Sequence, residues 1–206
     1  MTEKRNYSSD HYFVAVPKSE AKFGIIHTRL RGEPFKFMTA SSVFSKKQID
    51  SGTRLMIEAM MLPETGTVLD VGCGYGVIGI AAAVSNPRLH VIMTDLNMRA
   101  VQLARRNIKI NKVQNAEVRH GYLYEPVEDV TFNCVLSNPP VSAGMDKVKA
   151  IITEAPKIME NEATFQMVMR SKIGLRTFPA IFNKTFGNCQ IIARKSGYRV
   201  LKAKKQ

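Results

Sequence analysis

Residues 136–144, LSNPPVSAG, place an amide side chain and two prolines directly after the apolar run FNCVLS. Proline has no N–H for a sheet ladder and pushes the preceding residue out of the helical region, so Pro139 and Pro140 predict an abrupt end to a buried strand. Asn138 is then fixed at the strand's tip, where its side chain offers one carbonyl acceptor and two N–H donors. We predict that Asn138, Pro139 and Pro140 form a catalytic turn that holds a polar group; a simple proline-rich turn is the alternative.

A second chemical feature is TVLDVGCGYGVIGIAAA, residues 67–83, in which an apolar strand and a helix flank Gly72, Gly74 and Gly76. Gly74–Gly79 fits the dinucleotide pattern GxGxxG, so an NAD or FAD site has to be considered. However, the strand carries Asp70 at its end, and a carboxylate there would repel a pyrophosphate. Two like unit charges 4 Å apart repel by roughly 4 kcal/mol at an effective dielectric of about 20. The loop therefore favours a cationic ligand without phosphates.

S-adenosylmethionine is such a ligand, because it carries a sulfonium and an ammonium, and glycines let the backbone approach it closely. Asp70 would face its cationic end. Asp95 ends the next apolar run, HVIMTD, and a carboxylate there can accept the protons of both ribose hydroxyls. We therefore predict a cofactor site made of Asp70, the three glycines and Asp95, with Leu96 beside it and Asn138 as a further cofactor contact.

Alternating strands and helices would position these residues. TVLDV, HVIMTD, AEVRH, FNCVLS, TFQMVM and CQIIAR are expected strands, residues 77–84, 97–111, 146–160 and 172–185 are expected helices, and residues 46–62 form an earlier helix ended by Pro63. Asp146 is expected to cap the third helix, and Pro179 to kink or split the fourth. This α/β alternation predicts a doubly wound, mostly parallel sheet with helices on both faces. GYRVLKAKK is expected to return antiparallel at the edge.

The N-terminal segments HYFVAVP, FGIIHTRL and PFKFMT alternate like short strands. We predict that residues 1–42 form a small β appendage packed on the core and that residues 43–206 form the catalytic domain. At 206 residues the chain can bury a substantial core. The expected oligomeric state is a monomer or a weak dimer.

The formal charge of +13 lies mainly at the two ends of the chain. Residues 145–206 hold 13 Lys and Arg against 4 Asp and Glu, whereas residues 51–144 are balanced at 8 against 8. Positive potential attracts polyanions, so nucleic acid is the leading macromolecular partner, although a merely soluble basic surface has the same composition. Arg170 and Lys172, which follow the strand TFQMVM, and Arg199 in the last strand are candidate RNA-phosphate contacts.

Several classes of site and location are disfavoured. Four scattered histidines share no metal-ligand spacing, and Cys73, Cys134 and Cys189 form no CxxC and lie in or beside apolar runs, so no metal site and no disulfide is expected. No apolar stretch approaches the length of a membrane span, and MTEKRNYSSDHY lacks the apolar region of a secretory signal. A cytoplasmic location is expected.

These motifs together resemble the class I S-adenosylmethionine-dependent methyltransferases. DVGCGYGVIG is similar to their glycine motif, TDLNMRAVQLARRN to their ribose-binding segment, and SNPP to the motif of enzymes that methylate a nitrogen in a planar group. SSVFSKKQIDSG, NPPVSAG and GYRVLKAKK are similar to the "small" methyltransferase (RsmC-like) subfamily of short archaeal type. That resemblance implies a seven-stranded Rossmann-like sheet and methylation of a guanine N2 in small-subunit ribosomal RNA.

Two positions depart from the family pattern. Tyr122 in HGYLYEPV stands where many relatives carry an acid that is expected to accept from the adenine amino group. Tyr122 remains a cofactor-binding candidate, but it would stack on the adenine or donate a hydrogen bond instead. Methyltransferases that act on adenine N6 or glutamine N5 usually carry NPPY, whereas this chain has Val141 in place of the aromatic residue. Valine cannot stack on a base, which weakens adenine and glutamine as predicted substrates. Methylation of a protein glutamine or a small amine remains an alternative, as does a non-catalytic RNA-binding or assembly factor with this fold.

Overall fold

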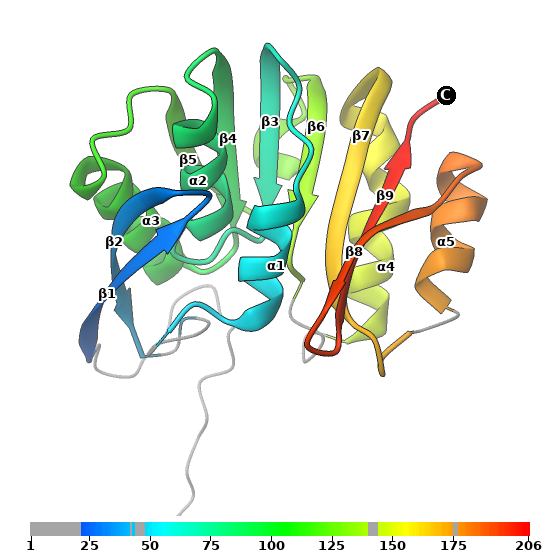
Figure 1. The fold of residues 1–206 in the computed structure, drawn as a ribbon. Helices are drawn as coiled ribbons and strands as arrows, with labels where there is room; N and C mark the ends of the chain where they lie inside the picture. Colours follow the sequence, from blue (N-terminus) through cyan, green and yellow to red (C-terminus); the bar gives the residue numbers. More distant parts are fainter. Residues whose placement is uncertain (1–21, 42, 44–47, 140–143, 175–176) are drawn as a thin grey trace, which may run out of the picture.

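A single seven-stranded sheet organises the chain (Figure 1). In this computed structural model the described residues are 22–41, 43, 48–139, 144–174 and 177–206. The strand order is β5-β4-β3-β6-β7-β9-β8, and its first five strands, β5, β4, β3, β6 and β7, run parallel to one another. The predicted doubly wound, mostly parallel sheet is confirmed. The strands are β3 Gly66–Val71, β4 Leu89–Asp95, β5 Ala116–His120, β6 Phe132–Ser137, β7 Met159–Arg170, β8 Gln190–Lys195 and β9 Tyr198–Lys204.

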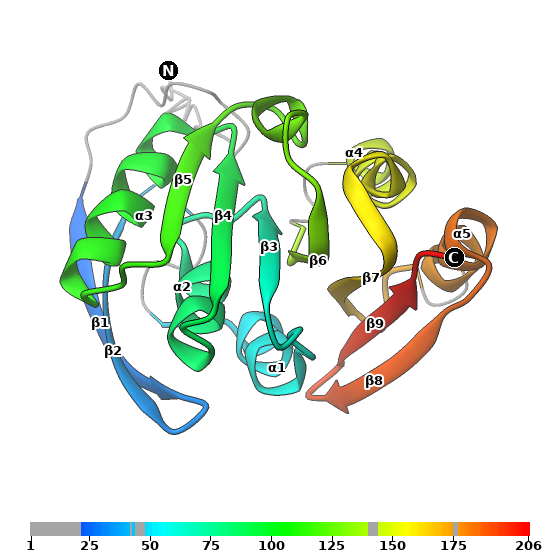
Figure 2. The ribbon, with the colours of Figure 1, turned by 90° about the horizontal axis from the view of Figure 1, so that it is seen from above.

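Helices cover both faces of the sheet, as the view from above shows (Figure 2). One face carries α1 Ser51–Ala59, α2 Val77–Ser85 and α3 Met98–Ile110, and the other carries α4 Met145–Glu154 and α5 Thr177–Phe186 with the short 3₁₀ turns η1 Glu125–Val127 and η3 Ala155–Ile158. Successive strand residues alternate between the two apolar clusters: Val68 packs with the first set of helices and Leu69 with the second. Because both faces are buried, the central strands are apolar throughout rather than alternating.

An antiparallel hairpin, β1 Phe23–Leu30 and β2 Glu33–Ala40, lies beside α3. Phe37 of β2 packs edge-on against Tyr75 of the glycine loop, with ring centroids 6.0 Å apart. The fully buried Asn107 of α3 donates to the carbonyls of Met38 and Tyr75 and accepts from the Met38 N–H at 2.7 Å. The hairpin is therefore joined to the glycine loop through α3. The predicted strand at residues 11–17 lies outside the described residues, and the domain division at residue 42 stays a prediction.

The sequence predicted the last strand at the edge of the sheet, but β9 lies inside it. β9 pairs antiparallel with both β7 and β8, so β8 forms the edge. Val200 and Leu201, adjacent residues that face opposite sides of β9, are both fully buried, whereas every residue of β8 is at least partly exposed. A strand buried on both faces belongs inside a sheet, and the turn at Ser196 and Gly197 inserts β9 there.

The last two helices are shorter than predicted. The helix expected over 146–160 spans Met145–Glu154, because Pro156 lies in the following 3₁₀ turn and β7 begins at Met159. Asp146 lies in the first turn and does not cap the helix; Gly144 is the cap residue. The helix expected over 172–185 spans Thr177–Phe186, and Pro179 falls in its first turn, where a missing N–H costs nothing. The expected kink is therefore wrong.

Candidate active site

The predicted cofactor residues come together at the carboxyl ends of β3, β4 and β5. The N–H groups of Gly72 and Cys73 both donate to the Thr94 carbonyl at 2.9 Å, and Gly121 N–H donates to the Asp95 carbonyl at 3.1 Å. These bonds hold the loops that follow the three strands beside one another. Ligands of open α/β sheets bind at this edge, because the loops there diverge and leave backbone groups unpaired.

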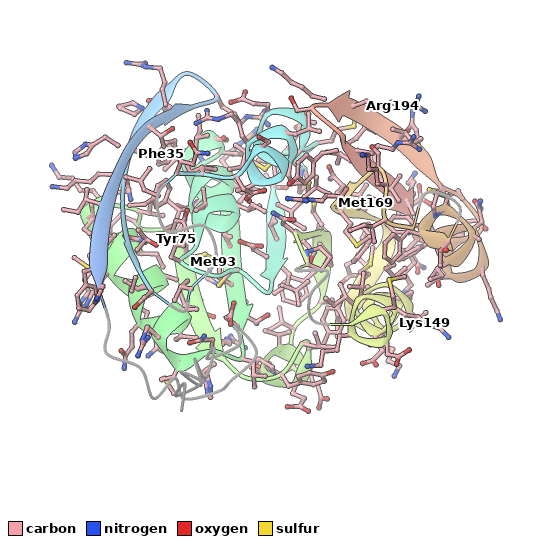
Figure 3. All side chains as sticks on the ribbon, turned by 90° about the horizontal axis from the view of Figure 1, so that it is seen from below. Phe35, Tyr75, Met93, Lys149, Met169 and Arg194 are labelled. Atoms are coloured by element: carbon pink, nitrogen blue, oxygen red, sulfur yellow. The ribbon has the colours of Figure 1, made fainter. Side chains whose placement is uncertain are left out.

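Gly76 and Gly72, in the loop after β3, differ in what surrounds the position of a Cβ atom. Gly76 has a φ of +90°, which favours glycine, and a Cβ there would also lie 3.1 Å from Ala104 and 3.3 Å from the Met93 sulfur and so crowd the packing of α2. Figure 3 shows Tyr75 and Met93 near one another in the half of the molecule that carries the hairpin. Gly72 has a φ of +72° but has nothing within 4 Å of a Cβ position. Backbone conformation and packing therefore both favour Gly76, whereas the space beside Gly72 is open to a ligand.

Asp70 is a buried carboxylate with one oxygen unused. Its Oδ2 accepts from the Gly79 N–H at 2.8 Å, in the first turn of α2, while its Oδ1 is buried and has no hydrogen-bond partner among the described residues. The residue is 1% exposed, and this burial raises the pKa of Asp70 to about 7; the Gly79 bond lowers it and the charge of Asp95 raises it. A buried acceptor without a partner is costly, and a cationic ligand would relieve that cost.

Asp95 holds two loops at once. Its Oδ2 accepts from the Gly74 N–H at 2.8 Å, and its Oδ1 accepts from the Asn97 N–H at 2.8 Å. A carboxylate oxygen can accept more than one hydrogen bond, so a hydroxyl donor is chemically compatible with this side chain. Leu96 follows, half-buried, and its carbonyl contacts the His120 Nε2 at 2.9 Å. The acid is thus 3% exposed and positioned by the glycine loop itself.

Tyr122 follows β5 and lines a hollow of about 440 Å³. The other residues of the hollow come from η1 and from the end of α4 and η3: Leu123, Tyr124, Glu125, Glu128, Glu154, Lys157 and Ile158. None of the glycine-loop residues lines it. Tyr124 is buried at its floor and donates its hydroxyl to the Ile151 carbonyl at 2.5 Å. The structure thus places Tyr122 at the same sheet edge as Asp95, but facing a hollow that is lined from the α4 side.

Asn138 follows β6, one strand along from Asp70, whose ladder partner is Leu136. The strand end is fixed by Ser137, which donates to the Val71 carbonyl at 3.0 Å. The Asn138 amide nitrogen donates to the Thr53 hydroxyl at 2.8 Å, and Pro139 is buried. Pro140 and Val141 lie outside the described residues. The predicted end of the strand at Ser137 is confirmed.

Of the basic candidates, Arg170 is tied to a neighbouring ring. Its Nε donates to the Tyr198 hydroxyl at 3.0 Å, and its guanidinium lies over that ring at 5.5 Å. Tyr198 in turn packs on the start of α1, since a Cβ at Gly52 would lie 2.7 Å from the ring. Arg170 therefore lies near the helix that contacts Asn138. Lys172 is exposed in the turn after β7, and Arg199 is half-buried in β9 opposite Met169.

Three residues of this site were missed by the sequence analysis: Asp50, Thr53 and Tyr198. Asp50 caps α1, accepting from Gly52 N–H at 2.9 Å and Thr53 N–H at 3.2 Å. The cap signal was readable in IDSGT, since Asp is a preferred cap residue before a helical pattern. Its link to Asn138 was not readable, because 85 residues separate Thr53 from Asn138.

Within the described ranges, no three His, Cys, Asp or Glu side chains group as metal ligands would, and the three cysteines are free. None of the described helices combines the length and apolarity needed to cross a membrane.

Comparison with known proteins decides the family. The model of the methyltransferase small domain matches residues 34–202. The chain belongs to the methyltransferase small domain family. The predicted class I, RsmC-like methyltransferase is thereby confirmed, with S-adenosylmethionine as its cofactor. The residues present fit that cofactor, since the unpartnered Asp70 oxygen and the open space at Gly72 suit a cation approached closely by backbone.

One similar protein matches this chain along nearly its whole length, and another matches it over about half of its own length. The uncharacterized protein YbxB of Bacillus subtilis is 34% identical over 96% of this chain and 99% of its own length. The ribosomal RNA small subunit methyltransferase C of Hamiltonella defensa is 28% identical over 85% of this chain. This methyltransferase chain matches about half the length, 52%, of that relative.

Among solved structures, the 16S rRNA N2 G1207 methyltransferase (RsmC) of T. Thermophilus, in complex with AdoMet and guanosine, superposes with a TM-score of 0.81. It is 23% identical, and the match covers 92% of this chain and 52% of that one. A precorrin-6y C5,15-methyltransferase from Geobacter metallireducens gives a TM-score of 0.64 at 17% identity. At these identities the likeness shows the shared methyltransferase fold.

Proposed function

We propose that this methyltransferase transfers a methyl group to the exocyclic N2 of a guanine in small-subunit ribosomal RNA. The observation that carries the proposal is the state of Asn138 at the end of β6. Its amide nitrogen is already engaged by Thr53, so its amide oxygen is the group left to accept a hydrogen bond. The similarity to rRNA methyltransferases C supports RNA as the substrate class, and so does the +13 formal charge.

The cofactor is proposed to lie over the carboxyl ends of β3 to β5. Gly72 leaves space for the backbone to approach it, Gly74 and Gly76 give the loop its positive-φ conformation, and Asp70 offers its unpartnered Oδ1 to the cationic end. Asp95, held in place by the N–H groups of Gly74 and Asn97, would accept from the ribose hydroxyls. Leu96 and Tyr122, which follow β4 and β5, would border the adenine.

Bound S-adenosylmethionine would supply a methyl group attached to its sulfonium sulfur. The amine nitrogen would bond to that methyl carbon as the carbon–sulfur bond breaks. An amine conjugated to a purine has a poorly available lone pair. The Asn138 side-chain oxygen and the Pro139 carbonyl oxygen are proposed to accept its two N–H bonds and so to turn the lone pair toward the methyl carbon. Positioning of this kind is worth roughly 7–11 kcal/mol in favourable cases, so no strong base is needed, and the nitrogen's proton can leave to water.

The basic residues Arg170, Lys172 and Arg199 are proposed to contact RNA phosphates around that acceptor. Arg170 is exposed and is the last residue of β7, the strand next to β6, so it lies at the same carboxyl edge. Val141 stays a predicted substrate contact that lies outside the described residues.

Radiolabelled S-adenosylmethionine separates this function from its rivals. The protein is incubated with naked RNA, with isolated small ribosomal subunits and with total protein, and labelled RNA is digested to nucleosides. We expect label in RNA or subunits that co-elutes with N2-methylguanosine. Label in protein glutamine or in a small amine would replace the proposal, label on adenine would change the base, and no label in any substrate would favour a non-catalytic binding protein.

A further inference from the structure

Behind Asn138 lies a chain of three side chains that ends on a helix cap. Asn138 Nδ2 donates to Thr53 Oγ1 at 2.8 Å, and the Thr53 hydroxyl donates to Asp50 Oδ2. The other Asp50 oxygen, Oδ1, accepts from two backbone N–H groups in the first turn of α1. Thr53 is 6% exposed, so solvent contributes little to this arrangement.

The direction of these hydrogen bonds follows from their final acceptor. An ionised carboxylate can only accept, so the single Thr53 hydroxyl proton points to Asp50. The Thr53 oxygen is then left as an acceptor toward Asn138, which must present its NH₂ group there. The oxygen and nitrogen of an amide are told apart by such a network, and this one admits a single orientation. The Asn138 oxygen therefore faces away from Thr53.

Helix α1 is held firmly enough to impose that orientation. Tyr198 packs against Gly52 at the start of the helix. At its end, the Arg31 guanidinium from the hairpin turn donates to the carbonyls of Ile57 and Met60, both at 3.0 Å. Helix α1 is thus fixed at its start to β9 and at its end to the hairpin, independently of Asn138.

We propose that Thr53 and Asp50 are positioning residues that lock the Asn138 amide with its oxygen toward the acceptor amine. The inference rests on the proposed function, in which that oxygen accepts an N–H of the substrate. A flipped amide would instead present N–H to N–H and could not orient the nitrogen lone pair. The helix cap at Asp50 thereby sets the hydrogen-bonding polarity of the catalytic turn.

Thr53→Val tests the lock, because valine keeps the shape of threonine and removes the hydroxyl. We expect kcat to fall about five- to a hundredfold, since a loosened catalytic group loses positioning, while the KM for RNA and the Kd for S-adenosylmethionine change less than about twofold. Thr53→Ser should restore kcat to within about threefold. Thr39→Val is the matched control: it removes a fully buried hydroxyl that has no partner among the described residues. It should leave kcat unchanged.

Asp50→Asn tests the direction of the chain without removing the cap. The Asn oxygen would keep the position that accepts from Gly52 and Thr53 N–H, which places its NH₂ where Oδ2 now faces Thr53. Thr53 would then accept from residue 50 and donate to Asn138, favouring the flipped amide. Since Asn caps helices as well as Asp, we expect a severalfold loss of kcat with little change in melting temperature.

A double-mutant cycle separates positioning from a general structural effect. In an Asn138→Ala background there is no amide to orient, so adding Thr53→Val should cost no further activity. Wild-type kcat in Thr53→Val, or an equal loss with and without Asn138, would overturn the positioning role and leave the proposed function standing. A wild-type protein that methylates no RNA would instead overturn the proposed function itself.

Discussion

We predict that the contribution of the buried Asp70 carboxyl to the free energy of unfolding falls as pH rises. Its pKa is about 7 in the folded chain, against an ordinary value of 3.8. Between these values the folded state keeps a proton that the unfolded state has released, so the free energy of unfolding decreases by about 1.4 kcal/mol per pH unit. The decrease begins near pH 4 and levels off above pH 7.

Asp70→Asn isolates this contribution. The Asn oxygen can accept from the Gly79 N–H as Asp70 Oδ2 does, but the side chain does not titrate. Relative to the Asn variant, the wild-type protein should lose about 2.5 kcal/mol of unfolding free energy between pH 5 and pH 8, because other groups titrate alike in both. The variant should also bind S-adenosylmethionine more weakly at pH 8, since it no longer offers a charge to the cation.

Urea unfolding without cofactor, followed by circular dichroism at pH 5, 6, 7 and 8, measures the difference. Asp146→Asn is the control, because it removes an exposed carboxylate in the first turn of α4. We expect that control to track the wild-type protein within about 0.5 kcal/mol. A wild-type and Asp70→Asn difference that is flat from pH 5 to pH 8 would refute the idea that Asp70 is a desolvated acid without a compensating partner.

Other predictions concern the rest of the site. Asn138→Ala should lower kcat about 10²–10³-fold with little change in cofactor affinity, measured by methyl transfer and calorimetry; full activity would remove Asn138 from the mechanism. Asp95→Asn cannot satisfy both Gly74 and Asn97 N–H, so it should cost about 1–3 kcal/mol of stability and weaken cofactor binding in calorimetry. Gly72→Ala should weaken cofactor binding more than Gly32→Ala, which has a similar positive φ in the hairpin turn. Lys172→Ala should flatten the log–log salt dependence of RNA binding by about 0.7–0.9, and an unchanged slope would exclude a phosphate contact.

The sheet was predictable because its central strands have strong local signals. Apolar runs that end at Asp70, Asp95 and Ser137 are buried on both faces, and their helical crossovers carry caps or glycines at the expected places. The predictions of the end of α4 and of the position of β9 were wrong, because the local sequence pattern was compatible with more than one structure. Pro156 ends a helix that apolar periodicity would continue, and β9 lies inside the sheet because a two-residue turn reverses the chain.

The meeting of the proposed cofactor residues was predictable for the same reason: each ends or follows its own strand, and parallel strands end at one edge. The Asn138 half was only partly so. NPP marks the turn, but the proposed partner of its amide comes from α1, and no spacing rule links two residues that meet only in the folded chain. Asn107 was recognised only as part of the segment that resembles the family's ribose-binding motif. In the structure its fully buried side chain joins the hairpin to the glycine loop by hydrogen bonds.

The raised pKa also refines the argument that excluded a dinucleotide. A protonated Asp70 would not repel a pyrophosphate, but a phosphate placed there would still meet the buried Asp95 carboxylate and would drive the Asp70 pKa higher. A sulfonium or ammonium acts in the opposite direction and releases the proton on binding. Because only the ionised acid attracts the cation, cofactor affinity should rise with pH up to about 7 and then level off. The carboxylate thus selects the sign of the ligand's charge, and burial sets the pH at which it does so.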